Sequence, residues 1–174
     1  MNFSPSPALA KNRKDLKDPE AIPLRYSKSR KEDRQCLLVV DNNSAVAEIL
    51  NEALEEWGYH VLVARNGWEG LMVAERHQVD GMLVDMHMPI MDGRTMLNEL
   101  RWLGHQMPVL MISNKSDERI LRQLLMEGAQ GFFLKPFHLP SLKQVCRQVF
   151  IKDKVEENPA PYSYSAQSNR SIKK

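Results

Sequence analysis

The sequence is short of cysteine. Its 174 residues include only two, Cys36 and Cys146. They lie far apart and neither stands at a metal-ligand spacing, so the sequence predicts neither a disulfide framework nor a zinc site. Two free thiols fit a reducing compartment, and we expect the protein to be cytoplasmic.

Long apolar runs are also missing. The N-terminal stretch MNFSPSPALAKNRK lacks the apolar centre of a secretion signal, and no uninterrupted apolar run is long enough to cross a bilayer. We therefore expect no membrane association. A chain of this length has room for one domain with tails rather than for two ordinary domains with linkers.

Charge is spread unevenly, although the net charge is only +2. Residues 1–35 hold nine Lys and Arg against five Asp and Glu, residues 36–150 hold ten against fourteen, and residues 151–174 hold five against three. The basic ends lack the interleaved aromatic residues and dense basic clusters typical of nucleic-acid binding, so we do not expect a nucleic-acid partner. Their prolines and missing apolar periodicity predict a disordered basic arm over 1–35 and a disordered tail over 151–174.

The middle of the chain, residues 36–150, alternates short apolar runs with amphipathic stretches. The apolar runs predict buried strands and the 3.6-residue periodicity predicts helices between them. Strands are expected at 37–40, 59–63, 82–85, 109–112 and 131–134, and helices at about 44–57, 66–77, 92–103, 116–127 and 140–150. Five consecutive strand–helix units predict a three-layer α/β domain with a five-stranded, parallel, doubly wound sheet.

Polar side chains stand where several of these strands end. Asp41 and Asn42 follow the first strand, Asp85 ends the third, Ser113 follows the fourth and Lys135 follows the fifth. A lone Asp85 before Pro89 would be read as a turn residue. In a doubly wound sheet, however, all the carboxyl ends of the strands meet at one edge, where ligands bind. The convergence of these groups favours a functional site over turn chemistry.

Four motifs, VVDNNS, DMHMPIMDG, MISNKS and FFLKPF, stand in this order along the predicted domain. Together they resemble the receiver domain of response regulators, the chemotaxis-regulator-like phosphoacceptor module of two-component signalling. The resemblance covers about residues 36–150 and implies a flavodoxin-like (βα)5 fold. It also implies a signalling role rather than an enzymatic one. We expect a stand-alone receiver, because no effector domain of helix-turn-helix or enzymatic type fits within 151–174.

The resemblance also implies a role for each site residue. Asp85 would accept a phosphoryl group from a histidine kinase or phosphotransfer protein, with Ser113 and Lys135 contacting the phosphate. Mg²⁺ would be held by Asp41, Asn42, Asp85 and the backbone carbonyl of His87. Ser113 and Phe132 would act as switch residues, and output would pass to an unknown protein through the surface of the fourth helix, fifth strand and fifth helix. Oxygen ligands and a lysine are what phosphoryl transfer requires. Proline after Lys135 allows a cis peptide bond that would direct the lysine inward.

Two positions depart from the family pattern. Asn42 stands where the family usually has a second carboxylate, and a neutral ligand holds a hard cation more weakly. Asn114 stands where the family prefers a small residue. Two interpretations stay open: a receiver that is phosphorylated on Asp85, and a pseudo-receiver that binds partners without phosphorylation. A mononucleotide-binding α/β enzyme is disfavoured because Asp41-Asn42-Asn43-Ser44 replaces the glycine-rich phosphate loop.

Overall fold

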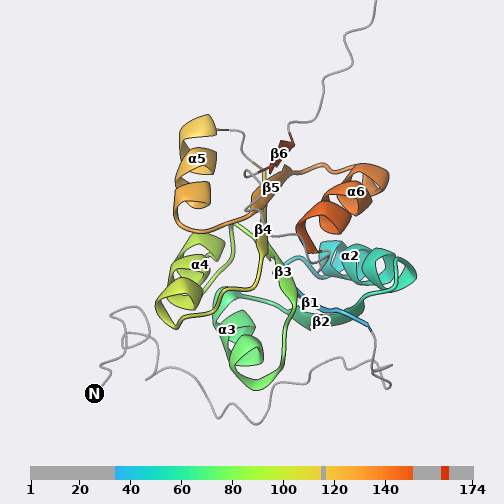
Figure 1. Ribbon diagram of the computed structural model, residues 1–174, viewed down its shortest axis with the longest axis horizontal. Coiled ribbons are helices and arrows are strands. Elements are labelled where there is room, and N and C mark those ends of the chain that lie inside the picture. Colours follow the sequence, from blue (N-terminus) through green and yellow to red (C-terminus); the bar gives the residue numbers. More distant parts are fainter. Residues whose placement is uncertain (1–33, 115–116, 151–161, 165–174) are drawn as a thin grey trace, which may run out of the picture.

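The structure, a computed structural model, describes residues 34–114, 117–150 and 162–164. Strands and helices alternate along the chain (Figure 1). The elements are β1 (Cys36–Val40), α2 (Ser44–Glu56), β2 (His60–Ala64), α3 (Gly67–Arg76), β3 (Gly81–Asp85), α4 (Gly93–Trp102), β4 (Val109–Ser113), α5 (Glu118–Met126), β5 (Gly131–Leu134), α6 (Leu139–Phe150) and β6 (Tyr162–Tyr164). The five predicted strand–helix units are confirmed. The predictions for residues 1–33 and for most of 151–174 lie outside the described residues.

The strands form one parallel sheet in the order β2-β1-β3-β4-β5-β6. The chain passes from β1 outward to β2 and then returns to the other side of β1 with β3. The carboxyl ends of β1 and β3 therefore flank the point where the winding reverses, which is where open α/β sheets bind ligands.

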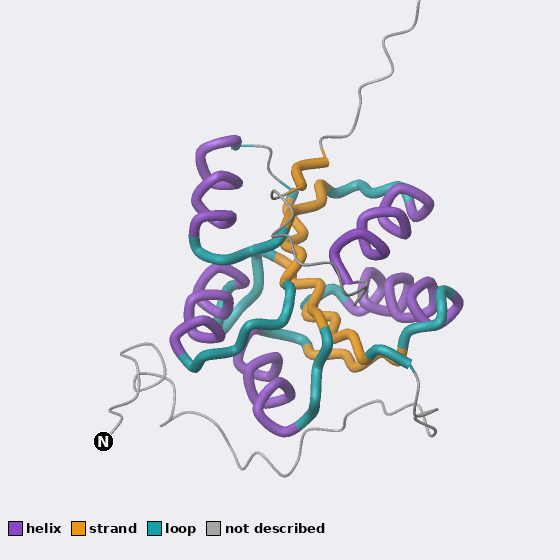
Figure 2. The backbone as a smooth tube through the Cα atoms, in the orientation of Figure 1, coloured by secondary structure: helices purple, strands orange, loops and turns teal. Residues whose placement is uncertain are grey.

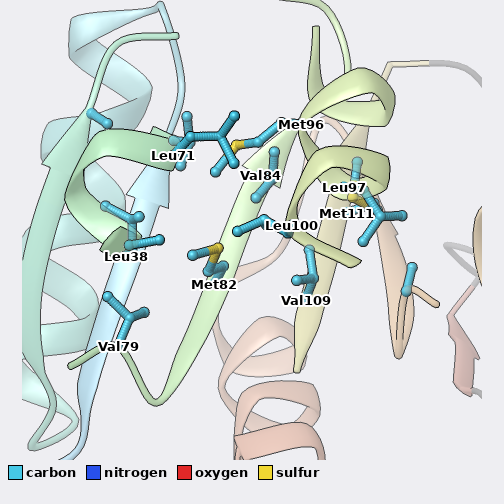
Figure 3. Packing of buried hydrophobic residues seen from close by; sticks show 14 of the residues in the cluster. Leu38, Leu71, Val79, Met82, Val84, Met96, Leu97, Leu100, Val109 and Met111 are labelled. Carbon is cyan, nitrogen blue, oxygen red and sulfur yellow. The ribbon is translucent and has the colours of Figure 1, made fainter. Parts of the chain in front are cut away.

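Helices cover both faces of the sheet, so the domain has three layers. Helices α2 and α6 lie on one face and α3, α4 and α5 on the other (Figures 1 and 2). Successive strand residues point to opposite faces. Leu38 of β1 packs among residues of α3 and α4 (Figure 3), whereas its neighbour Leu37 belongs to the cluster that includes Leu50 of α2 and Phe150 of α6. Burial on both faces explains why the strands are almost continuously apolar.

Side-chain caps fix where the helices begin. The side chain of Asn66 accepts a hydrogen bond from the backbone N–H of Glu69 at 2.9 Å, and Asp92 accepts one from Thr95 at 2.8 Å. Each cap satisfies a backbone N–H that the helix leaves unpaired. Helix α5 is capped by Asp117, and Ser116, which was expected to open it, lies outside the described residues.

The sixth strand was not expected. The sequence predicts a disordered tail over 151–174, but the structure pairs Tyr162–Tyr164 in parallel with β5. A physical reason is that β5 would otherwise end the sheet with unpaired backbone groups, and tyrosine has a high preference for strands. Within the described ranges, no helix is long and apolar enough to span a membrane.

Candidate functional site

The polar groups predicted at the strand ends stand at the carboxyl edge of the sheet. Asp85 is the last residue of β3 and Ser113 the last of β4, while Asp41 and Lys135 directly follow β1 and β5. The parallel register brings these ends level, with Asp85 beside Ile112 and Ser113 beside Leu134. One edge of the sheet thus collects groups that are up to 94 positions apart in the chain.

One ammonium group joins two of the strand ends. Lys135 donates hydrogen bonds from Nζ to Oδ2 of Asp41 at 2.8 Å and to Oδ1 of Asp85 at 2.9 Å. The two carboxylates are nearly inaccessible, with side chains 1% and 4% exposed, and that of Lys135 is 15% exposed. Burial works against the charge on Lys135, but the hydrogen bonds to both carboxylates outweigh it and raise the pKa of the lysine. The site is therefore a pair of buried carboxylates that share one cation.

The loop after β1 shows how the sequence departs from a three-carboxylate site. Oδ1 of Asp41 accepts a hydrogen bond of 2.9 Å from the backbone N–H of Asn43. The side chain of Asn43 accepts from Ala45 and Val46 and so caps α2. Asn42 lies between these two residues and is exposed. As a neutral residue it adds no charge to the two buried carboxylates.

The loop after Asp85 packs tightly against the residue that it follows. A Cβ atom at Gly93 would lie 2.2 Å from the carbonyl oxygen of Asp85, so only glycine fits there. Ile90 adopts φ 69°, a left-handed conformation that costs energy for a β-branched residue. The residues Pro89 and Gly93 indicate a turn, but the sequence contains no signal for the left-handed isoleucine. His87, expected to offer its carbonyl to a metal, has an exposed side chain.

The other predicted residues lie on β4 and β5. Ser113 is buried, and its carbonyl accepts a 2.8 Å hydrogen bond from the backbone N–H of Lys135, which ties the two strand ends together. Asn114, directly after Ser113, is exposed. The expected cis peptide bond between Lys135 and Pro136 is confirmed. Phe132 is buried in the core under α3, α4 and α5, which is the inward position of the predicted aromatic switch.

The oxygen donors of this edge suit a hard cation. Two buried carboxylates already share one cationic group, and Asn42 and the backbone carbonyls of the loop are neutral oxygen donors of the kind that Mg²⁺ takes. In the described part of the chain, no group of three His, Cys, Asp or Glu side chains is arranged to hold a metal ion.

Comparison with known proteins places this arrangement in a family. The family model for the response regulator receiver domain matches residues 37–147. A probable C4-dicarboxylate response regulator DctR of Priestia megaterium is 32% identical over 114 residues, covering 64% of this chain and 50% of that protein. The transcriptional regulatory protein PcoR of Escherichia coli is 32% identical over 108 residues, covering 62% of this chain and 48% of that protein.

Solved structures of receiver domains have the same fold as this chain. The receiver domain of the Francisella response regulator 1452 superposes with a TM-score of 0.65 at 26% identity, covering 67% of this chain and 97% of that one. A chain from the CheX-CheY-BeF3-Mg complex of Borrelia burgdorferi superposes with a TM-score of 0.65 at 27% identity, covering 68% and 90%.

A doubly wound parallel sheet with an acidic pair and a lysine at its carboxyl edge is the architecture of a receiver module. The chain belongs to the response regulator receiver domain family and is a receiver of two-component signalling. It spans about half the length of the curated relatives that it matches. The functions named for those regulators therefore do not pass directly to this chain.

Proposed function

We propose that this receiver accepts a phosphoryl group on Asp85 from the phosphohistidine of a histidine kinase or phosphotransfer protein. The observation that carries the proposal is the buried contact of Lys135 with Asp41 and Asp85. A carboxylate that is to be phosphorylated needs a cation beside it, because the transferred group brings further negative charge into a site that is largely shielded from water.

In the proposed reaction, one carboxylate oxygen of Asp85 attacks the phosphorus of the phosphohistidine. The phosphorus–nitrogen bond breaks, its electron pair stays on the imidazole, and an acyl phosphate forms on Asp85. Lys135 transfers its hydrogen bond from Asp85 to a phosphoryl oxygen while it stays paired with Asp41. The hydroxyl of Ser113 donates to a second phosphoryl oxygen. The phosphoryl group remains on the chain, so we propose a phosphoacceptor rather than an enzyme.

We propose that Asp41, Asn42, Asp85 and the carbonyl of His87 hold Mg²⁺ in this reaction. When bound, Mg²⁺ supplies neutralising charge to the phosphoryl oxygens. The proposed output is contact with a protein on the surface formed by α5, β5 and α6. Ser113 at the end of β4 and Phe132 on β5 connect the site to this surface. Cys36 and Cys146 are buried thiols outside any disulfide, which supports a cytoplasmic setting.

A small phosphodonor such as acetyl phosphate, added with Mg²⁺, tests the proposal. We expect one acid-stable, base-labile phosphoryl group by intact mass, and none in Asp85→Asn. The matched control is Asp92→Asn, in the same loop, since asparagine also caps helices and Asp92 only caps α4. This control should still be phosphorylated.

A second candidate is a pseudo-receiver that binds its partners without phosphorylation. Asn42 favours it, because this site has one carboxylate fewer than the family pattern and thus less charge to hold a divalent cation. The same mass measurement decides between the two functions. Absence of an adduct at every Mg²⁺ concentration, from a protein that unfolds cooperatively, supports the pseudo-receiver.

A further inference from the structure

The two outer edges of the core sheet are protected in different ways. A free strand edge presents unpaired backbone groups that can pair with another chain. At the β2 edge, the backbone N–H of Val61 donates to Oε1 of Glu55 at 3.1 Å, so a charged side chain of α2 blocks that edge. At the β5 edge, the backbone of Tyr162–Tyr164 adds a further strand.

Strand β5 has no protection of its own. Its sequence, Gly131-Phe132-Phe133-Leu134, contains no charge and no proline, which are the usual devices against edge-to-edge pairing. Its two phenylalanines have high strand preference, so an uncovered β5 would be a site for the addition of an extended segment. The edge also lies between α5 and α6, on the surface proposed above for output (Figure 1).

We propose that Tyr162–Tyr164 is an intramolecular cover of the β5 edge, which keeps an extended segment of another molecule from adding there. The register places Ser163 beside Phe132, with Tyr162 beside Gly131 and Tyr164 beside Phe133. The cover thus lies along the strand that carries Phe132 and ends two positions before Lys135. It concerns access to β5 and does not depend on phosphorylation of Asp85.

The length of the connection favours occupancy by the chain's own segment. Eleven residues, 151–161, separate the end of α6 at Phe150 from Tyr162. They can reach roughly 36 Å when extended, more than a domain of this size requires to return a segment to the sheet. A separate three-residue strand would pair too weakly to stay bound. A short tether, however, provides an effective concentration of about millimolar, enough to hold the cover while leaving it displaceable by a longer strand.

Amide hydrogen exchange of the full chain tests the cover, without Mg²⁺ or phosphodonor so that the outcome is separate from phosphorylation. Ser163→Pro removes the backbone N–H from the middle of the three-residue strand and so weakens its pairing with β5. We expect the amides of Gly131–Leu134 that face β6 to exchange about tenfold faster. Leu83 and Val84 in the central strand β3 should keep their protection, which shows that the domain is still folded. The matched control is Ser168→Pro, the same change four residues beyond β6, which should leave β5 exchange as it is.

Two further measurements give the proposal a definite outcome. A peptide of residues 159–167, PAPYSYSAQ, should restore β5 protection to Ser163→Pro at about millimolar concentration and bind the unmodified chain more weakly. Protection in the unmodified chain should not vary with protein concentration. If the amides of β5 exchange at the same rate in Ser163→Pro and in the unmodified chain, the proposed cover is wrong. Protection that grows with concentration also overturns it, because the occupant is then the segment of a second copy.

Discussion

Lys135 donates a 2.9 Å hydrogen bond from Nζ to Oδ1 of Asp85, although their strands, β5 and β3, are not neighbours in the sheet. The lysine side chain reaches past the end of β4, which lies between them. Together with the 2.8 Å bond from the same Nζ to Asp41 after β1, this contact links the ends of three strands at the edge where the proposed chemistry occurs. A phosphoryl group on Asp85 would take a hydrogen bond from the Lys135 ammonium. The bonds that link these strand ends would then change.

The contact predicts a large stability loss in Lys135→Met. Removing the ammonium leaves Asp41 and Asp85 buried beside each other without their cation, and breaking a buried pair in this way costs about 3 kcal/mol. Urea unfolding at neutral pH measures it. The same substitution at Lys143, whose ammonium lies 5.5 Å from the ring centroid of Trp57, should cost less than about 1 kcal/mol. Equal losses in the two variants would show that the buried pair contributes nothing particular.

A second prediction concerns the loop after the acceptor. Ile90 has φ 69° and is 59% exposed, so its side chain contributes little burial while its backbone is strained. Ile90→Gly should raise the free energy of unfolding by about 1 kcal/mol, because glycine adopts this conformation without steric cost. Thermal unfolding measures the gain. The matched control is Ile49→Gly at a similarly exposed position inside α2, which should instead lose about 1 kcal/mol.

Most of the fold was predictable because each element carries its own periodic signal. The strands are buried on both faces and read as continuous apolar runs, and helix caps such as Asn66 and Asp92 mark the boundaries. The convergence of Asp41, Asp85 and Lys135 was also predictable, because parallel strands place their carboxyl ends at one edge. The roles given to these residues stay predictions until phosphorylation is measured.

The remaining features depend on tertiary context. A strand of three residues is too short to show a two-residue period, and Pro159 and Pro161 before it indicate a loop, so β6 was missed. The left-handed Ile90 contradicts the preference of its residue type and is imposed by the loop around it. The link from Lys135 to Asp41 was not predicted either, since the resemblance assigns the lysine to the phosphate and says nothing about its partners beforehand.

A third prediction uses the pH dependence of stability. Burial of the Cys146 thiol raises its pKa from the usual 9.0 to about 12. Between these values the unfolded chain loses the thiol proton while the native state keeps it, so stability present below pH 9 falls as the pH rises toward 12. The slope should reach about 1.4 kcal/mol per pH unit at most. Urea unfolding from pH 8.5 to 11 should be less steeply pH-dependent in Cys146→Ala. Val145→Ala, a buried neighbour without a titrating group, should keep the slope.

The last prediction tests the position where the site departs from its family. Asn42→Asp adds a third carboxylate, in the loop after β1 and next to Asp41 in the chain. A charge about 4 Å from a cation near a protein surface contributes up to about 4 kcal/mol before desolvation and repulsion are subtracted. We expect a net gain nearer 1 kcal/mol, or several-fold in Mg²⁺ affinity by calorimetry, and lower stability without metal because three anions then repel one another. Asn43→Asp is the matched control: its side chain already caps α2 through Ala45 and Val46, so metal affinity should change much less. If Asn42→Asp alters neither affinity nor stability, residue 42 does not face the site, and the metal-binding role proposed for this loop is wrong.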